Sequence, residues 1–175
     1  HYSIPIIGIE PGIKPASTLT QSAVIGVLAT AQTASSDSFQ SLIQRVAGRT
    51  TILVQPCPGL VEQVEKMDFE GEETLALVRK YLQPLLARGA DTLVLGCTHY
   101  GFLSPLIQRI AGSDVRIIDT QDAVAKEVCR RLRIEGLVCT RQRSGQEQFW
   151  SSDNSGSAHP LFSRLWGKAV TVASL

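Results

Sequence analysis

The stretch from Ala23 to Thr30, Ala-Val-Ile-Gly-Val-Leu-Ala-Thr, limits the fold more than any other part of this chain. It is apolar up to its last residue, yet it is far shorter than the ~20 residues that a membrane-spanning helix needs. A short apolar run of this kind predicts a strand that is covered on both faces, which is typical of parallel sheets packed between helices. We therefore expect an α/β fold.

Strand-like and helix-like patterns alternate along most of the chain. Further strands are predicted at residues 5–9, 51–54, 92–95 and 115–119. Apolar residues recur at helical spacing from Ser36 to Gly48, from Pro58 to Val64, over Glu70–Arg88, over Leu103–Ile110 and from Asp122 to Leu132. This order predicts a parallel sheet flanked by helices on both faces. Beyond it we expect a polar loop over residues 141–160, a short helix at 161–166 and a strand at 170–172.

Composition excludes several classes of partner. The net charge of +1 over 175 residues gives no electrostatic basis for binding nucleic acid or an anionic membrane. No segment is apolar for long enough to span a membrane, and no glycine-rich fingerprint for a nucleotide cofactor is present. The four cysteines form no Cys-x-x-Cys pair, so we expect no metal site and reduced thiols in a cytoplasmic protein.

The segment Leu93–Tyr100, Leu-Val-Leu-Gly-Cys-Thr-His-Tyr, is the leading candidate for a site. A buried strand that ends at a glycine delivers Cys97, Thr98 and His99 to the loop that follows it, where α/β proteins place their sites. A thiol acts as a base or nucleophile only as the thiolate, and a neighbouring histidine favours that form. The alternatives are a small core cysteine and a loop histidine without a chemical role.

Other candidates also follow predicted strands. Thr30 and Thr33 carry hydroxyls that can bind a carboxylate or close a turn. Glu65 ends a short helix and is either a functional or a solvated carboxylate. Because parallel strands end at one edge of a sheet, we expect Thr30, Cys57, Cys97 and Asp119 to gather there. We interpret Cys57, Cys129 and Cys139 as packing residues.

Five segments, in order, resemble the glutamate racemases of bacteria. They are Glu10-Pro-Gly-Ile-Lys-Pro-Ala16, Gly26-Val-Leu-Ala-Thr30 with Thr33, Cys57-Pro through Glu65, Leu95-Gly-Cys-Thr-His-Tyr100, and Ile117-Ile-Asp-Thr120 with Ala123 and Ala125. The resemblance covers roughly residues 5–135.

The resemblance implies interconversion of L-glutamate and D-glutamate without pyridoxal phosphate or metal, supplying D-glutamate for peptidoglycan. Two thiols work from opposite faces of the Cα atom: one removes its proton while the other delivers one. By this resemblance Cys97 acts on the L-isomer, His99 and Glu65 assist it, and Thr98, Thr30 and Thr33 contact the substrate.

The resemblance also implies two similar α/β domains with the site between them. Residues 15–120 would form the second domain, and residues 1–14 and 121–175 would belong to the first. The family's N-terminal Asp-Ser segment and Cys-Asn-Thr motif, which holds the other cysteine, have no match in this sequence. With His1 first and a strand-like run directly after it, we expect a fragment that carries half of a two-base site.

Three alternatives stay open at this point. The first is a related aspartate or broad-specificity racemase, since the residues that select side-chain length are undetermined. The second is a truncated, non-catalytic binding module, which the missing cysteine favours. The third is thiol hydrolysis, in which Cys97 would be acylated. Family members differ in how they dimerise, so a homodimer is open as well.

Overall fold

The computed structural model describes residues 4–139, 145–153 and 156–175. Its helices and strands are α1 (Ile13–Leu19), β1 (Val24–Ala29), α2 (Ala31–Ser35), α3 (Asp37–Val46), β2 (Thr51–Pro56), α4 (Leu60–Glu65), α5 (Glu72–Ala87), β3 (Thr92–Leu95), the 3-10 helix η1 (Thr98–Leu103), α6 (Ser104–Ala111), β4 (Arg116–Ile118), α7 (Gln121–Ile134), β5 (Phe149–Ser151), α8 (Ala158–Trp166) and β6 (Val172–Ser174). Among the described residues, no helix is both long enough and apolar enough to cross a membrane.

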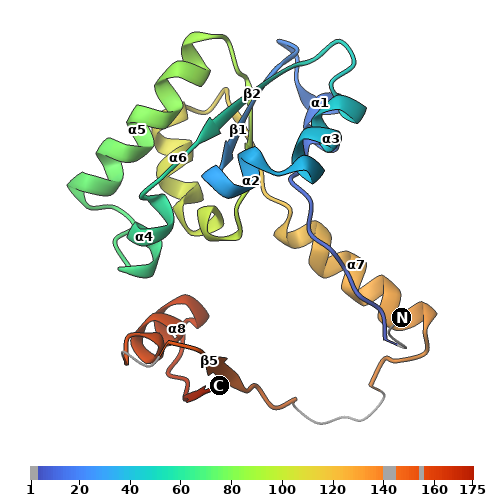
Figure 1. Cartoon of the computed structure of the whole chain (residues 1–175), viewed down its shortest axis with the longest axis vertical. Helices are drawn as coiled ribbons and strands as arrows, with labels where there is room; N and C mark the ends of the chain where they lie inside the picture. Colours follow the sequence, from blue (N-terminus) through green and yellow to red (C-terminus); the bar gives the residue numbers. More distant parts are fainter. Residues whose placement is uncertain (1–3, 140–144, 154–155) are drawn as a thin grey trace.

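Four parallel strands form the main sheet, in the order β2-β1-β3-β4 (Figure 1). The predicted strands at 51–54, 92–95 and 115–119 are confirmed, as is the apolar strand from Ala23 to Thr30, which is β1. β1 and β3 are the inner strands, and their side chains are almost completely buried. The predicted α/β fold with a parallel sheet is therefore confirmed.

Helices cover both faces of this sheet, because successive side chains of a strand point to opposite faces. Ile25, Val27 and Val94 pack on one side with residues of α1 and α3. Leu28 and Leu93 pack on the other side, in the larger core that α4, α5, η1 and α6 complete. The result is a three-layer arrangement with two hydrophobic cores (Figure 1).

Local signals placed several helix ends correctly. The Ser36 hydroxyl accepts a hydrogen bond from the Phe39 N–H and caps α3, as the sequence predicts. Gly48 follows the end of this helix with a positive φ of 50°, a conformation that glycine adopts without strain. α5 runs continuously through Pro84. Helix α1 has no counterpart among the predicted helices.

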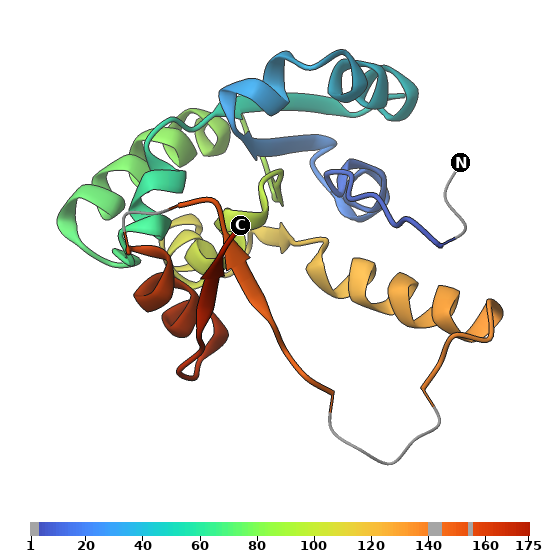
Figure 2. The ribbon, with the colours of Figure 1, turned by 60° about the horizontal axis from the view of Figure 1, so that its bottom comes forward.

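The predicted strand at residues 5–9 is wrong. This segment has no strand partner in the described part of the chain. Ile6 is 69% exposed and Ile9 is 53% exposed, as is Ile4 just before them by 66%, whereas Ile7 is half-buried. A strand is stable only when its backbone groups are paired, and nothing pairs with them here. The segment instead runs alongside α7 and shares a groove with Ala123 and Val124 (Figures 1 and 2).

The chain beyond residue 145 is more regular than predicted. β5 and β6 form a parallel pair joined through α8, so the predicted loop at 141–160 is wrong at residues 149–151 and 158–160. Its residues 141–144 and 154–155 lie outside the described ranges. The predicted helix at 161–166 is confirmed within α8, and the last strand lies slightly later than the predicted 170–172.

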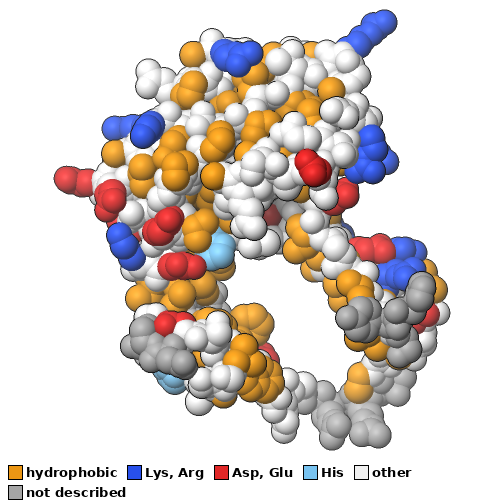
Figure 3. Space-filling view, viewed as in Figure 1, with side chains coloured by type: hydrophobic (Ala, Val, Ile, Leu, Met, Phe, Trp, Pro, Cys, Tyr) orange, Lys and Arg blue, Asp and Glu red, His pale blue; other side chains and the backbone are white. Residues whose placement is uncertain are grey.

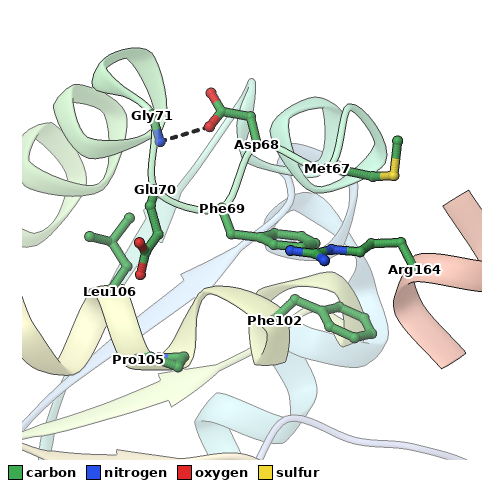
Figure 4. Close-up of a pocket in the computed structure, with 9 residues that line it drawn as sticks. All are labelled: Met67, Asp68, Phe69, Glu70, Gly71, Phe102, Pro105, Leu106 and Arg164. Carbon is green, nitrogen blue, oxygen red and sulfur yellow. Dashed lines mark hydrogen bonds between the residues drawn. The ribbon is translucent and has the colours of Figure 1, made fainter. Parts of the chain in front are cut away.

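Helix α8 packs against the part of the fold that holds the four-stranded sheet, and an open cavity lies between them. Arg164 lines this cavity of about 480 Å³ together with Phe69 and Phe102 (Figure 4). The two phenyl rings stack with centroids 6.2 Å apart. Leu165 packs against the larger core from the same helix. In the space-filling view an open gap separates the terminal unit of β5, α8 and β6 from the arm formed by α7 (Figure 3).

Candidate active site

Cys97, His99 and Glu65 lie in a line at the carboxyl ends of the strands. The Cys97 sulfur is 3.8 Å from Nδ1 of His99, and Nε2 of the same ring is 3.6 Å from Oε1 of Glu65. The histidine side chain is 35% exposed and the glutamate side chain is 54% exposed. The structure therefore brings together all three residues that the resemblance assigns to catalysis.

Backbone geometry explains why Cys97 lies where it does. Gly96 donates a backbone hydrogen bond to the carbonyl of Leu28, and a Cβ at this position would lie only 2.8 Å from that oxygen. A glycine thus lets the end of β3 approach β1 closely. The next residue, Cys97, still has extended backbone angles, and η1 begins directly after it.

Tyr100 anchors η1 from below. Its side chain is completely buried, and its hydroxyl donates to the Cys57 carbonyl at 3.3 Å. Cys57 immediately precedes the turn that opens α4, the helix that ends at Glu65. One buried side chain therefore links the helix of His99 to the helix of Glu65.

The thiol of Cys97 is harder to ionise than an ordinary cysteine. Partial burial raises its pKa above the usual value of 9.0, and the backbone N–H groups of His99 and Tyr100 offset only part of that rise. The resting group is therefore the thiol. A base within reach is needed to produce the thiolate, and Nδ1 of His99 is in position for that step.

A cavity of about 300 Å³ opens beside the thiol. Its lining residues come from the ends of β3 and β4, from α2 and from the N-terminal segment: Ile9, Pro11, Thr33, Leu95, Gly96, Cys97, Thr98, Asp119, Thr120 and Gln121. Of the predicted site residues, Cys97, Thr98 and Thr33 line this cavity. His99, Glu65 and Thr30 do not, so His99 and Glu65 lie behind the thiol.

The hydroxyl of Thr30 is used in hydrogen bonds to a neighbouring residue. It accepts a hydrogen bond from the Thr33 N–H at 3.1 Å, which caps α2, and donates to the Thr33 hydroxyl at 2.9 Å. Thr30 therefore orients Thr33, and Thr33 is the one of the two that lines the cavity.

The remaining cysteines differ from one another. Burial raises the pKa of the Cys57 thiol to about 12, and that thiol donates to the Gln55 carbonyl at 3.1 Å. Cys57 is a core residue, as predicted. The prediction that Cys129 and Cys139 pack in the interior is wrong, because both are exposed. Within the described ranges, no group of three or more His, Cys, Asp or Glu residues is arranged to hold a metal ion.

Gln121 is a feature of the cavity that sequence reasoning missed. It is the first residue of α7 and follows the end of β4, and its side-chain amide donates to the Thr98 carbonyl at 3.2 Å. Asp119 was expected at this edge of the sheet. Gln121 follows it by two residues past the end of the same strand, so it could have been expected at the same edge.

Comparison with known proteins decides the family. Residues 1–128 match the family described as Asp/Glu/Hydantoin racemase. The chain belongs to this family. The resemblance to glutamate racemases is thereby confirmed at the level of the family, and relatives with that name agree. Glutamate racemase from Methylococcus capsulatus is 48% identical over 166 residues, which is 95% of this chain and 61% of the relative.

Solved structures agree with the fold. Glutamate racemase from Bacillus anthracis superposes with a TM-score of 0.85 at 28% identity, covering 99% of this chain and 65% of that one. The Escherichia coli glutamate racemase, solved with L-glutamate and the activator UDP-MurNAc-ala, gives a TM-score of 0.83 at 25% identity and the same two coverages. The chain thus spans a little under two thirds of the length of these relatives.

Proposed function

We propose that this chain carries one half of a glutamate racemase site, with Cys97 as the acid and base on the L-face of the substrate. The observation that carries the proposal is the line from Cys97 through His99 to Glu65 beside a cavity lined by hydroxyls. The similar proteins named glutamate racemase, and the E. coli structure solved with L-glutamate, support glutamate as the substrate.

The first step is activation of the thiol. Cys97 gives its proton to Nδ1 of His99, and the resulting imidazolium is stabilised by the Glu65 carboxylate near its other nitrogen. The ion pair of thiolate and imidazolium is the reactive state, since only the thiolate is basic enough to act. His99 and Glu65 assist from behind, without lining the cavity.

The second step is transfer of the Cα proton. The thiolate takes the proton from Cα of L-glutamate, and the electron pair remains on the substrate as a carbanion conjugated with its carboxylate. In the reverse direction the Cys97 thiol returns a proton to the same face. Inversion needs a second acid on the opposite face, and Cys97 is the only cysteine that lines the cavity in the described part of the chain.

Thr98 and Thr33 are our proposed substrate contacts. Both line the cavity, and hydroxyl and backbone groups at the end of a parallel sheet suit a carboxylate. The Thr30 hydroxyl contributes by holding Thr33. Because a thiol base must stay reduced, we place the protein in the cytoplasm, where D-glutamate would be available for peptidoglycan.

We keep the proposed division into a second domain at 15–120 and parts of a first domain at 1–14 and 121–175. Exposed apolar residues support it: Ile4 and Ile6 before the sheet and Ile134 after it are more than half exposed. α7 contains no buried residue among those described. Side chains of this kind are usually covered in a complete protein.

Hydrogen exchange at Cα tests the proposal. The chain is incubated in D₂O with L-glutamate, D-glutamate or L-aspartate, and proton NMR follows exchange while polarimetry follows inversion. We expect exchange of L-glutamate without inversion, abolished in Cys97→Ala and kept in Cys129→Ala, whose cysteine is exposed and does not line the cavity.

Three results would contradict the proposal in different ways. No exchange with any substrate would show that Cys97 is not a working base in this chain. Faster exchange of aspartate would shift the substrate to the shorter dicarboxylate. Inversion of glutamate by this chain would reveal a second base and would overturn the proposed half-site.

A further inference from the structure

The start of α7 meets the loop of the reactive cysteine at a contact that the mechanism above does not use. Gln121 is held there by its own backbone, since its N–H donates to Oδ1 of Asp119 at 3.0 Å. Its side-chain Nε2 then donates to the Thr98 carbonyl at 3.2 Å. One residue therefore connects the ends of β3 and β4 across the cavity.

Gly101 leaves the space that this amide occupies. A Cβ at residue 101 would overlap Nε2 of Gln121 and would lie 2.7 Å from Oδ2 of Asp119, closer than real side chains approach. Residues 98 and 101 are three apart in a 3-10 helix and so lie on the same side of it. The backbone at Gly101 does not have a positive φ, so a larger residue there meets no conformational strain but would push aside the ends of the Gln121 and Asp119 side chains.

We propose that Gln121 is a positioning residue for the Cys97–His99 pair: its amide holds the Thr98 carbonyl, and Gly101 leaves room for that amide. The role of the pair in proton transfer rests on the proposed function. The positioning contact itself rests only on the geometry of residues 98, 101 and 121.

The peptide group between Thr98 and His99 transmits the effect. A peptide group is planar, so fixing its carbonyl also fixes the direction of its N–H. That N–H belongs to His99 and acts on the Cys97 sulfur, where it lowers the pKa of the thiol. Hydrogen bonds on the two sides of one peptide group also strengthen each other. Gln121 thus favours the thiolate without touching it.

The test is the pH dependence of Cys97 alkylation by iodoacetamide, which requires no substrate. Lysine and arginine residues separate the four cysteines, so each falls in a different tryptic peptide and mass spectrometry follows each one alone. The variants are Gln121→Leu, which keeps the size of the side chain but removes the donor, and Gly101→Ala, which displaces the amide.

Matched controls are available in the same chain. Gln83→Leu changes an exposed helical glutamine on α5 that does not line the cavity. Gly8→Ala adds a Cβ at a glycine with nothing within 4 Å of it. Exposed Cys129 reports on general thiol reactivity, and buried Cys57 reports on loosening of the fold.

We expect both test variants to raise the apparent pKa of Cys97 and to slow its alkylation at neutral pH by about three-fold, the effect of one exposed neutral hydrogen bond. Cys129 labelling and both controls should stay unchanged. An unchanged Cys97 profile in Gln121→Leu overturns the proposal. An unchanged profile in Gly101→Ala alone overturns the role of Gly101, and faster labelling of Cys57 would show that the fold has loosened instead.

The two proposals can fail separately. If glutamate exchange is absent while the alkylation shift occurs, the proposed function is wrong and the positioning contact stands. If exchange depends on Cys97 while Gln121→Leu leaves the thiol unaffected, the reverse holds.

Discussion

At the scale of single residues, the chemistry depends on which neighbour of Cys97 can accept the proton of its thiol. Cys97 alone stays a thiol at neutral pH because partial burial raises its pKa. His99 lies at a distance of 3.8 Å from the sulfur, and Glu65 lies 3.6 Å from the other side of the ring. Cys97 therefore depends on His99 to take its proton before the thiolate can act on the substrate.

Replacing the histidine tests this account. His99→Ala should lower the rate of Cα exchange of L-glutamate by about 100-fold, the usual contribution of one general base. Glu65→Gln should cost roughly ten-fold, since it removes only the stabilisation of the imidazolium. Exchange measured by NMR gives both values. His159→Ala on α8 is the matched control, and full activity of His99→Ala would refute the role of the ring.

At the scale of secondary structure, one carboxylate holds the opposite end of the sheet together. Asp91, just before β3, accepts hydrogen bonds from the Thr20 hydroxyl at 2.6 Å, from the backbone N–H groups of Gln21 and Ser22 at 2.7 and 2.6 Å, and from the Thr92 hydroxyl at 2.9 Å. The connection from α1 to β1 is thereby fixed to the start of β3. These hydrogen bonds form a clamp at the end of the sheet from which both strands run toward the site.

The clamp predicts a stability that depends on pH. Burial raises the pKa of Asp91, but these hydrogen bonds outweigh it and lower the value from 3.8 to about 2. Because the folded pKa lies below the unfolded one, the stabilisation is present above about pH 4 and is lost as the pH falls toward 2. Asp91→Asn should lose about 2 kcal/mol at pH 7.

Urea unfolding at pH 7 and at pH 2 measures this loss. It should shrink at the lower pH, because pH 2 lies below the unfolded pKa of Asp91 and at about its folded pKa, so most of the stabilisation from the charge is gone. Asp114→Asn is the control, since that carboxylate is exposed and has one weak hydrogen bond from Ser113 at 3.4 Å. An equal loss at both pH values would mean that the charge of Asp91 is not responsible.

At the scale of the whole molecule, apolar side chains on the N-terminal segment and at the end of α7 face solvent. Ile6 is 69% exposed and Ile134 is 62% exposed, and Leu137 and Val138 follow with about half of their surfaces exposed. Apolar side chains also gather along the α7 arm in the space-filling view (Figure 3). Surfaces of this kind favour contact with another protein surface.

We expect this chain to self-associate in a concentration-dependent way, which sedimentation velocity measures. Ile6→Glu and Ile134→Glu should each weaken the association constant by roughly ten-fold, the value of one buried aliphatic side chain. Leu19→Glu is the control, since this residue lies on α1 and is 41% exposed. A monomer at all concentrations, or equal effects of all three substitutions, would show that this surface does not drive association.

The sequence by itself determined which segments along the chain become the main strands and helices, and where the reactive loop follows a strand. Those features depend on local signals: apolar runs such as Ala23–Thr30, the cap at Ser36, and the strand that ends at Gly96. Each acts within a few residues, so each is visible in the chain itself. The assignment of His99 and Glu65 as partners of Cys97 came from the family resemblance and not from spacing.

Only the tertiary structure decided which residues meet. The prediction of a strand at residues 5–9 was wrong because pairing depends on a neighbour and not on apolar character. The place of Thr33 in one cavity with Cys97 and the contact of Gln121 with Thr98 both depend on strands joined in space. Residues distant in the chain are brought together by the order β2-β1-β3-β4, which no local pattern encodes.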